Sequence, residues 1–139
     1  MPMLDRETLD RITAEAKGFV ENYYRTFDAN RTELVNLYRE ESVMNFECRE
    51  RIKGKEAIVA KLNSLQQCQL HISKMNCSPV ALTHGALVLA IGFLWLDGKP
   101  EALSFSQSFF LEPTPEGSFY IQGNGWKTFD RRQERLPII

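Results

Sequence analysis

The side chains most able to take part in catalysis or binding are carboxylates that lie close to large aromatic residues in the sequence. Glu47 directly follows Phe46, while Asp97 and Glu101 come a few residues after Trp95. Paired carboxylates can perform acid–base chemistry, and carboxylates at the edge of an apolar pocket can orient a basic partner. Solvated charges on strands and turns are the simpler alternative. The pattern therefore makes Phe46 and Trp95 candidate pocket-lining residues and the three acids candidate rim residues.

Other catalytic and metal-binding patterns are absent from the sequence. The histidines His71 and His84 are far apart, and Cys48, Cys68 and Cys77 form no pair with metal-ligand spacing. The sequence contains no nucleophile elbow, no phosphate-binding glycine loop and no HExxH motif. Cys48 has no evident base nearby, so a structural thiol is favoured over a nucleophile. We therefore expect no catalytic residues, no metal and no cofactor.

Size and charge limit the classes of protein to consider. The 139 residues carry 17 basic and 18 acidic side chains, for a net charge of −1. At roughly 150 residues per domain, we expect a single domain over 1–139, with a core over about 5–128 and a charged tail over about 129–139. The balanced charge argues against direct nucleic-acid binding. The longest apolar run is about half of the roughly 20 residues that cross a bilayer, which argues against a membrane-spanning segment or a membrane partner. We also expect no secretion signal.

Apolar residues three or four positions apart predict an amphipathic helix over the first part of the chain. They are Leu9, Ile12, Ala16, Phe19, Tyr23 and Phe27, with Val20 and Tyr24 widening the apolar face. Asn30, followed by Glu33, resembles a capping box and predicts a second, short helix to about Tyr38. After Gly54, a third helix is predicted from the spacing of Ile58, Leu62 and Leu65.

Alternating hydrophobicity and turn residues predict strands elsewhere. Short strands are expected at Val43–Phe46 and Arg51–Lys53, and longer ones around Leu70–Ile72, Ala86–Leu96, Leu103–Leu111 and Ser118–Lys127. Turns at Asp97–Pro100 and Pro113–Gly117 separate the last three, and Gly123–Gly125 is expected to form a bulge or bend. The order of elements predicts an α+β fold with the helices on one face of an antiparallel sheet.

The strand Ala86–Leu96 lacks the alternation typical of a sheet that is covered on one face. Its second face therefore needs apolar cover, and no remaining segment is long enough to supply it. Leu87, Leu89 and Ile91 share one parity along this strand. We expect them to form the interface of a homodimer that packs sheet against sheet.

Several segments, taken in order, resemble the nuclear transport factor 2 family, in the form found in plants and fungi. They are Phe19–Tyr24, Phe27–Arg31, Leu37–Tyr38, Phe46–Glu47, Ile52–Leu62, Phe105–Phe109 and Pro113–Tyr120. The resemblance covers about 19–127, nearly the whole domain. It implies a cone-like fold of three helices packed on a strongly bent antiparallel sheet whose outer face forms the dimer.

The resemblance also implies a function. Family members are non-enzymatic carriers that bring Ran-GDP into the nucleus, holding an aromatic side chain of Ran in an apolar cavity with an acidic rim. By position, Phe46 corresponds to a cavity-lining aromatic and Glu47 and Asp97 to rim acids. Trp95 and Glu101 complete the expected Ran-binding set. The implied locations are the cytoplasm, the nucleus and the nuclear pore.

A second partner class is implied by passage through the pore, where carriers contact Phe-Gly repeats of nucleoporins. The first helix extends about two turns before the part that resembles the family. Leu9 and Ile12 lie in this extension. We expect them to form a partly exposed ledge for a repeat Phe side chain, although packing on the end of the domain is an equal alternative.

Two other functions remain open on the sequence. One is the small subunit of a messenger-RNA export receptor, which pairs with a larger subunit; the long first helix and Lys99, which stands where animal carriers have an acid, favour this alternative. The other is an isomerase or dehydratase of the same fold, such as ketosteroid isomerase or scytalone dehydratase. Such an enzyme needs a buried Asp, Tyr or His set aimed at one substrate atom, and no His–Asp pair is evident.

Overall fold

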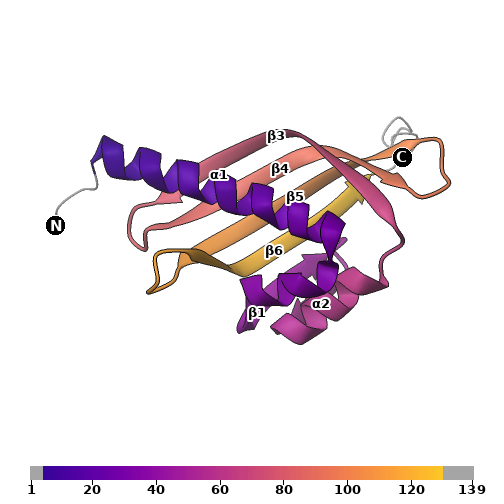
Figure 1. Cartoon of the computed structure of the whole chain (residues 1–139), viewed down its shortest axis with the longest axis horizontal. Coiled ribbons are helices and arrows are strands. Elements are labelled where there is room, and N and C mark those ends of the chain that lie inside the picture. Colours follow the sequence, from indigo (N-terminus) through magenta and orange to yellow (C-terminus); the bar gives the residue numbers. More distant parts are fainter. Residues whose placement is uncertain (1–4, 130–139) are drawn as a thin grey trace, which may run out of the picture.

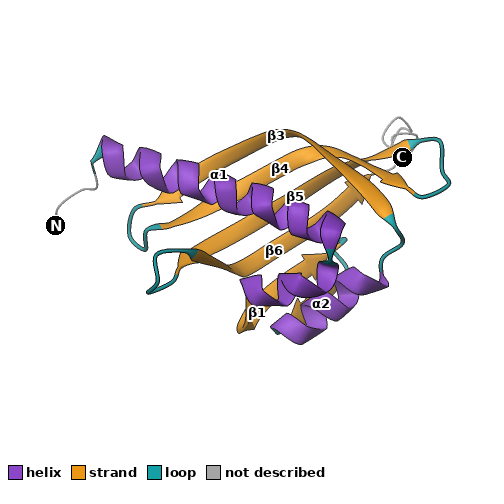
Figure 2. Ribbon diagram, viewed as in Figure 1, coloured by secondary structure: helices purple, strands orange, loops and turns teal. Residues whose placement is uncertain are grey.

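A computed structural model of the chain describes residues 5–129. Helices and strands form two layers, with α1 lying across one face of a curled sheet and the two short helices grouped beside β1 (Figures 1 and 2). The helices are α1 (Arg6–Ala29), the 3₁₀-helix η1 (Arg31–Leu37) and α2 (Lys55–Ser64). The strands are β1 (Tyr38–Phe46), β2 (Glu50–Lys53), β3 (Cys68–Val80), β4 (Gly85–Leu96), β5 (Ala102–Pro113) and β6 (Phe119–Phe129). The predicted α+β class, with three helices on one bent sheet, is confirmed.

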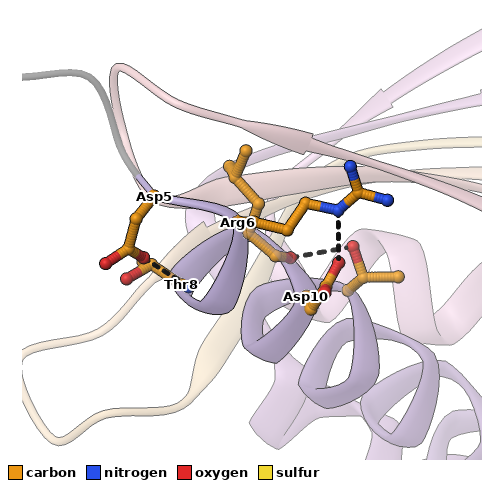
Figure 3. Close-up of polar contacts among 6 residues, drawn as sticks. Asp5, Arg6, Thr8 and Asp10 are labelled. Atoms are coloured by element: carbon orange, nitrogen blue, oxygen red, sulfur yellow. Dashed lines mark hydrogen bonds and ion pairs between the residues drawn. The ribbon is translucent and has the colours of Figure 1, made fainter.

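Helix α1 begins at a side-chain cap. The Asp5 carboxylate accepts a hydrogen bond of 2.8 Å from the Thr8 amide, and Arg6 lies 3.8 Å from Asp10 on the exposed side (Figure 3). The cap satisfies one of the free amides at the helix start. The opposite side is the predicted apolar stripe, and its buried members are Ile12, Ala16, Val20, Tyr23, Tyr24 and Phe27.

The second helix differs in type from the expectation. Asn30 caps it by accepting from the Thr32 amide at 3.1 Å, two residues on, and not through the three-residue spacing of a capping box with Glu33. The segment is a 3₁₀-helix, the form that short helical connectors often take. Helix α2 and strand β2 lie close to their predicted positions, whereas β1 begins at Tyr38, five residues before the predicted Val43.

The sheet is mixed, with the strand order β2-β1-β6-β5-β4-β3. Strand β1 runs parallel to β6, while every other neighbouring pair is antiparallel. The expectation of an entirely antiparallel sheet is therefore wrong for this one pair, because hydrophobic patterns do not reveal the direction in which distant strands meet. The pairing of β5 with β6 shifts between Phe110 and Leu111, where Ile121 and Gly123 are the partners. This bulge borders the glycines of Gly123–Gly125, which lie within β6.

Strand β4 is apolar on both sides, and the two sides have different surroundings. Ala86, Val88, Ala90 and Leu94 are buried beneath the helices, whereas Leu87, Leu89 and Ile91 face outward with 47%, 39% and 41% of their surface exposed. At Gly92, a β-carbon would collide with the carbonyl oxygen of His71 on β3. A glycine here therefore permits the close approach of β3, whose pairing is irregular at the same level.

A buried polar network joins α1 to the inner face of the sheet. The Tyr24 hydroxyl donates to Gln107 at 2.8 Å, and the Gln107 amide donates to the Tyr23 hydroxyl at 3.2 Å and to Asn124 at 3.1 Å. The Tyr38 hydroxyl donates to Asn124 at 3.0 Å and lies 3.0 Å from the Tyr23 hydroxyl. Among the described residues, every buried side-chain nitrogen or oxygen has a hydrogen-bond partner. These bonds fix the position of α1 on the sheet.

The tyrosines of this network should make the protein sensitive to alkali. Burial raises the pKa of Tyr23 to about 12 and also raises the pKa values of Tyr24 and Tyr38. Below pH 10, both the folded and unfolded states keep these protons. Between pH 10 and 12 only the unfolded chain releases them, so the free energy of unfolding should fall over this range. Urea unfolding across the range measures this fall, Tyr23→Phe should reduce it, and a constant stability up to pH 12 would contradict the assignment.

Candidate functional site

The three candidate rim acids share one end of the sheet. The strand register pairs Ser104 with Phe129 and Trp95 with Ala102, so β4 and β6 end near the start of β5. Phe46 pairs with Trp126, which pairs with Gln107, so β1 ends five residues further along β5. The turn between β4 and β5 lies at the end of the molecule opposite the β3–β4 and β5–β6 turns, as Figure 1 shows on the right. Strands β1 and β4, which precede Glu47 and Asp97, are three strand spacings apart across the sheet, roughly 14 Å.

An aromatic cluster lies on the inner face at this end. Trp126 is buried, with its ring centroid 4.8 Å from that of Phe105, 5.9 Å from that of Phe27 and 6.0 Å from that of Phe46. Phe46 is half-buried, and the Lys61 ammonium lies 4.5 Å from its ring centroid. The arrangement supplies an apolar floor at the strand ends, with Phe46 as its more accessible member.

Lys61 ties the helix α2 to this floor. Its ammonium donates a 2.7 Å hydrogen bond to the Glu50 carboxylate on β2, in a pair that is partly exposed. A cation over an aromatic face is attracted by the ring quadrupole. One cation therefore connects α2, the Phe46 ring and β2. The sequence analysis did not predict this contact because Glu50 and Lys61 belong to different elements.

Glu47 forms hydrogen bonds and an ion pair with residues at the end of β6. Its amide donates to the Trp126 carbonyl at 2.8 Å, and its carboxylate accepts from the Thr128 amide at 3.0 Å and from the Thr128 hydroxyl at 2.7 Å. The Lys127 ammonium lies 3.7 Å from the same carboxylate. Glu47 has a left-handed backbone with φ of 55°, a conformation that is unfavourable for residues other than glycine. These contacts hold the turn after β1 against the end of β6.

Asp97 and Trp95 line a different part of the strand ends. A pocket of about 590 Å³ includes Trp95, Asp97 and Lys99 with Gln67 and Cys68, and its lining contains neither Phe46 nor Glu47. Trp95 follows the outward parity of Leu87, Leu89 and Ile91 along β4, and 38% of its surface is exposed. The expectation that Trp95 shares an inner pocket with Phe46 is therefore wrong, because alternation along the strand turns the two rings to opposite faces.

Arg31 organises the segment that borders this pocket. Its guanidinium donates to the carbonyl oxygens of Leu62 at 2.9 Å and Leu65 at 3.0 Å and to the Gln67 side chain at 3.2 Å. It also lies 4.4 Å from the centroid of the Phe27 ring. Several donors in one planar group can satisfy carbonyls that a helix end leaves free. Sequence analysis placed Arg31 in a motif but gave it no such role.

The other residues predicted from the sequence differ in how far they are exposed. Glu101 is exposed beside the turn between β4 and β5. Leu9 is half-buried, but only 4% of the Ile12 surface is exposed. The expected exposure of Ile12 is therefore wrong, because this turn of α1 packs on the sheet; nucleoporin contact at Leu9 stays a prediction. Positions 130–139 of the expected charged tail lie outside the described residues, and Phe129 belongs to β6.

The described residues form neither a metal cluster nor a helix that could cross a membrane. Over residues 5–129, no three His, Cys, Asp or Glu side chains gather in a way that could hold a metal. In the same part of the chain, no helix has both the length and the apolar composition needed to cross a bilayer.

Both the sequence and the fold of this chain match known proteins. The model of the Nuclear transport factor 2 (NTF2) domain matches residues 15–124. The chain belongs to the nuclear transport factor 2 family. Nuclear transport factor 2B of Arabidopsis thaliana is 52% identical over 110 residues, which cover 78% of this chain and 86% of that protein. The structure of nuclear transport factor 2 from Cryptosporidium parvum matches with a TM-score of 0.77 and 32% identity, over 91% of this chain and 99% of that one.

The family fold extends to more distant proteins. A chain of the Candida albicans Mtr2–Mex67 M domain complex matches with a TM-score of 0.69 over 89% of this chain and 97% of that one. The two sequences are only 18% identical, so this similarity shows a shared fold and nothing more.

Proposed function

We propose that this member of the nuclear transport factor 2 family is a non-enzymatic carrier that binds Ran-GDP at the strand ends and takes it into the nucleus. The names of its relatives support a role in nuclear transport. The observation that carries the Ran-GDP proposal is the position of Glu47 beside the Phe46–Trp126 floor, at the end of the sheet toward which the Asp97–Glu101 turn also extends. Apolar area supplies affinity there, and the acids orient a basic partner.

The outer face of the sheet supports a homodimer. Leu87, Leu89 and Ile91 form an exposed apolar row on β4, and two such rows meeting sheet against sheet would cover each other. Weak contacts with Phe-Gly nucleoporins would then use Leu9 or the seam between protomers, since Ile12 is buried. A carrier with these partners would occur in the cytoplasm, the nucleus and the nuclear pore.

The polar core supports a non-enzymatic function. Enzymes of this fold need a buried acid or base free to meet a substrate. Here the inward hydroxyls of Tyr23, Tyr24 and Tyr38 are bonded to one another or to Gln107 and Asn124. Their raised pKa values keep them protonated at neutral pH, so none supplies a base.

The second candidate function is the small subunit of a messenger-RNA export receptor. The same outward row of β4 would then pack against a larger subunit and not against a second copy. Lys99 in the pocket lining beside Asp97 favours this candidate, because its charge opposes a basic partner at the rim.

A pull-down with the purified full chain separates the two functions. Immobilised protein is offered Ran loaded with GDP, Ran loaded with GTP, and the larger export subunit. The carrier proposal expects retention of Ran-GDP in preference to Ran-GTP. Retention of the export subunit in a one-to-one complex, with no Ran-GDP bound, would overturn it in favour of the export function.

A further inference from the structure

The Lys127 ammonium occupies the position that a basic group of a partner would need at Glu47. It lies 3.7 Å from Glu47 Oε1, and the two side chains keep 36% and 22% of their surface exposed. The contact is longer than both bonds from Thr128 to the same carboxylate. Among the donors at Glu47, Lys127 is therefore the one that can leave without breaking the backbone contact between β1 and β6.

The Lys127 ammonium also contacts a second group, the ring of Phe129, in the same position. Its ammonium lies 5.2 Å from the ring centroid of Phe129, which is exposed at the end of β6. A cation within about 6 Å of an aromatic face gains energy from the ring. If the ammonium moved away from Glu47, the Phe129 ring would continue to stabilise it while the carboxylate kept its two bonds to Thr128.

We infer that Lys127 is an exchangeable counter-ion, which neutralises Glu47 in the free protein and yields that carboxylate to a basic side chain of the bound partner. The inference rests on the proposed function, because it concerns the same rim acid. Two cations cannot share one carboxylate without repulsion, so Lys127 lowers the affinity for every basic partner and favours release. A carrier gains from such a group because transport requires dissociation as well as binding.

The test compares the affinities of full-length variants for Ran-GDP by calorimetry. Lys127→Met keeps the length of the side chain and removes the competing charge, so it should bind about two- to fivefold more tightly than the wild type. Lys17→Met is the matched control: it makes the same charge change in the middle of α1, away from Glu47 and from the outward row of β4, and should alter the affinity less than about twofold.

A double-mutant cycle identifies the residue through which Lys127 acts. In a Glu47→Gln background, Lys127→Met should give no gain in affinity, since no carboxylate is left to release. Binding by the wild type with an equal or weaker affinity in Lys127→Met would overturn the counter-ion role alone, as would a gain that persists in the Glu47→Gln background. Failure of both the wild type and Lys127→Met to bind Ran-GDP would overturn this inference together with the proposed function.

Discussion

Replacing Leu89 with glutamate should prevent formation of the proposed homodimer and leave the protein monomeric. Leu89 lies in the middle of β4, paired with Asn76 on β3 and Ser108 on β5, and its side chain faces outward. In the proposed dimer, this position is covered by the partner sheet, and a carboxylate placed there would lose its hydration without gaining a counter-charge. Burial of an unpaired charge costs several kcal/mol, enough to dissociate a dimer of ordinary affinity.

Light scattering on the purified variant measures the change in mass. Leu82→Glu provides the control, because Leu82 is 79% exposed at the turn between β3 and β4 and lies outside the sheet face. It should leave the dimer intact while introducing the same charge. A monomeric wild type at concentrations on the order of tens of micromolar would contradict the proposed interface.

Replacing Glu47 with lysine should abolish measurable binding to Ran-GDP. The change removes the rim acid, places a second ammonium beside Lys127 and removes the acceptor of both Thr128 bonds. Loss of one member of a hydrogen-bonded charge pair commonly costs about 2 to 5 kcal/mol, so an affinity loss of roughly 30-fold or more is expected.

Two variants separate recognition from structure at Glu47. Glu47→Gln keeps an oxygen acceptor for Thr128 but lacks the charge, so it should fold normally and still bind Ran-GDP weakly. Thr128→Val removes the 2.7 Å bond from the hydroxyl and preserves the charge, so it should lower the melting temperature slightly and retain binding. Normal Ran-GDP affinity in Glu47→Lys would contradict the role of this carboxylate.

Much of the fold follows from local patterns in the sequence. The stripe from Ile12 to Phe27 predicts the buried side of α1, and the unalternating run Ala86–Leu96 predicts a strand with apolar residues on both faces. These patterns are informative because side chains repeat their direction every 3.6 residues in a helix and every two in a strand. The spacing of apolar residues therefore indicates which face is buried. The motifs that resemble the nuclear transport factor 2 family then correctly identify the family.

The features that sequence reasoning missed depend on contacts between distant segments. The parallel pairing of β1 with β6 joins Phe46 to Trp126 across eighty residues of chain, and no local pattern encodes that direction. Arg31 acquires its role only when the end of α2 packs beside η1. Glu47 lies at the end of β1, and its bonds to Thr128 depend on the register of β6, which no local pattern encodes.

Mapping the Ran-GDP contact on the protein tests the central claim most directly. Amide chemical shifts of isotopically labelled full-length protein are followed as Ran-GDP is added. The proposed site predicts that the largest changes will occur at Glu47, Thr128 and the Asp97–Glu101 turn, with little change at the Ala81–His84 turn on the opposite end of the sheet. Changes centred on Ala81–His84, or no changes at saturating Ran-GDP, would contradict the strand ends as the binding site.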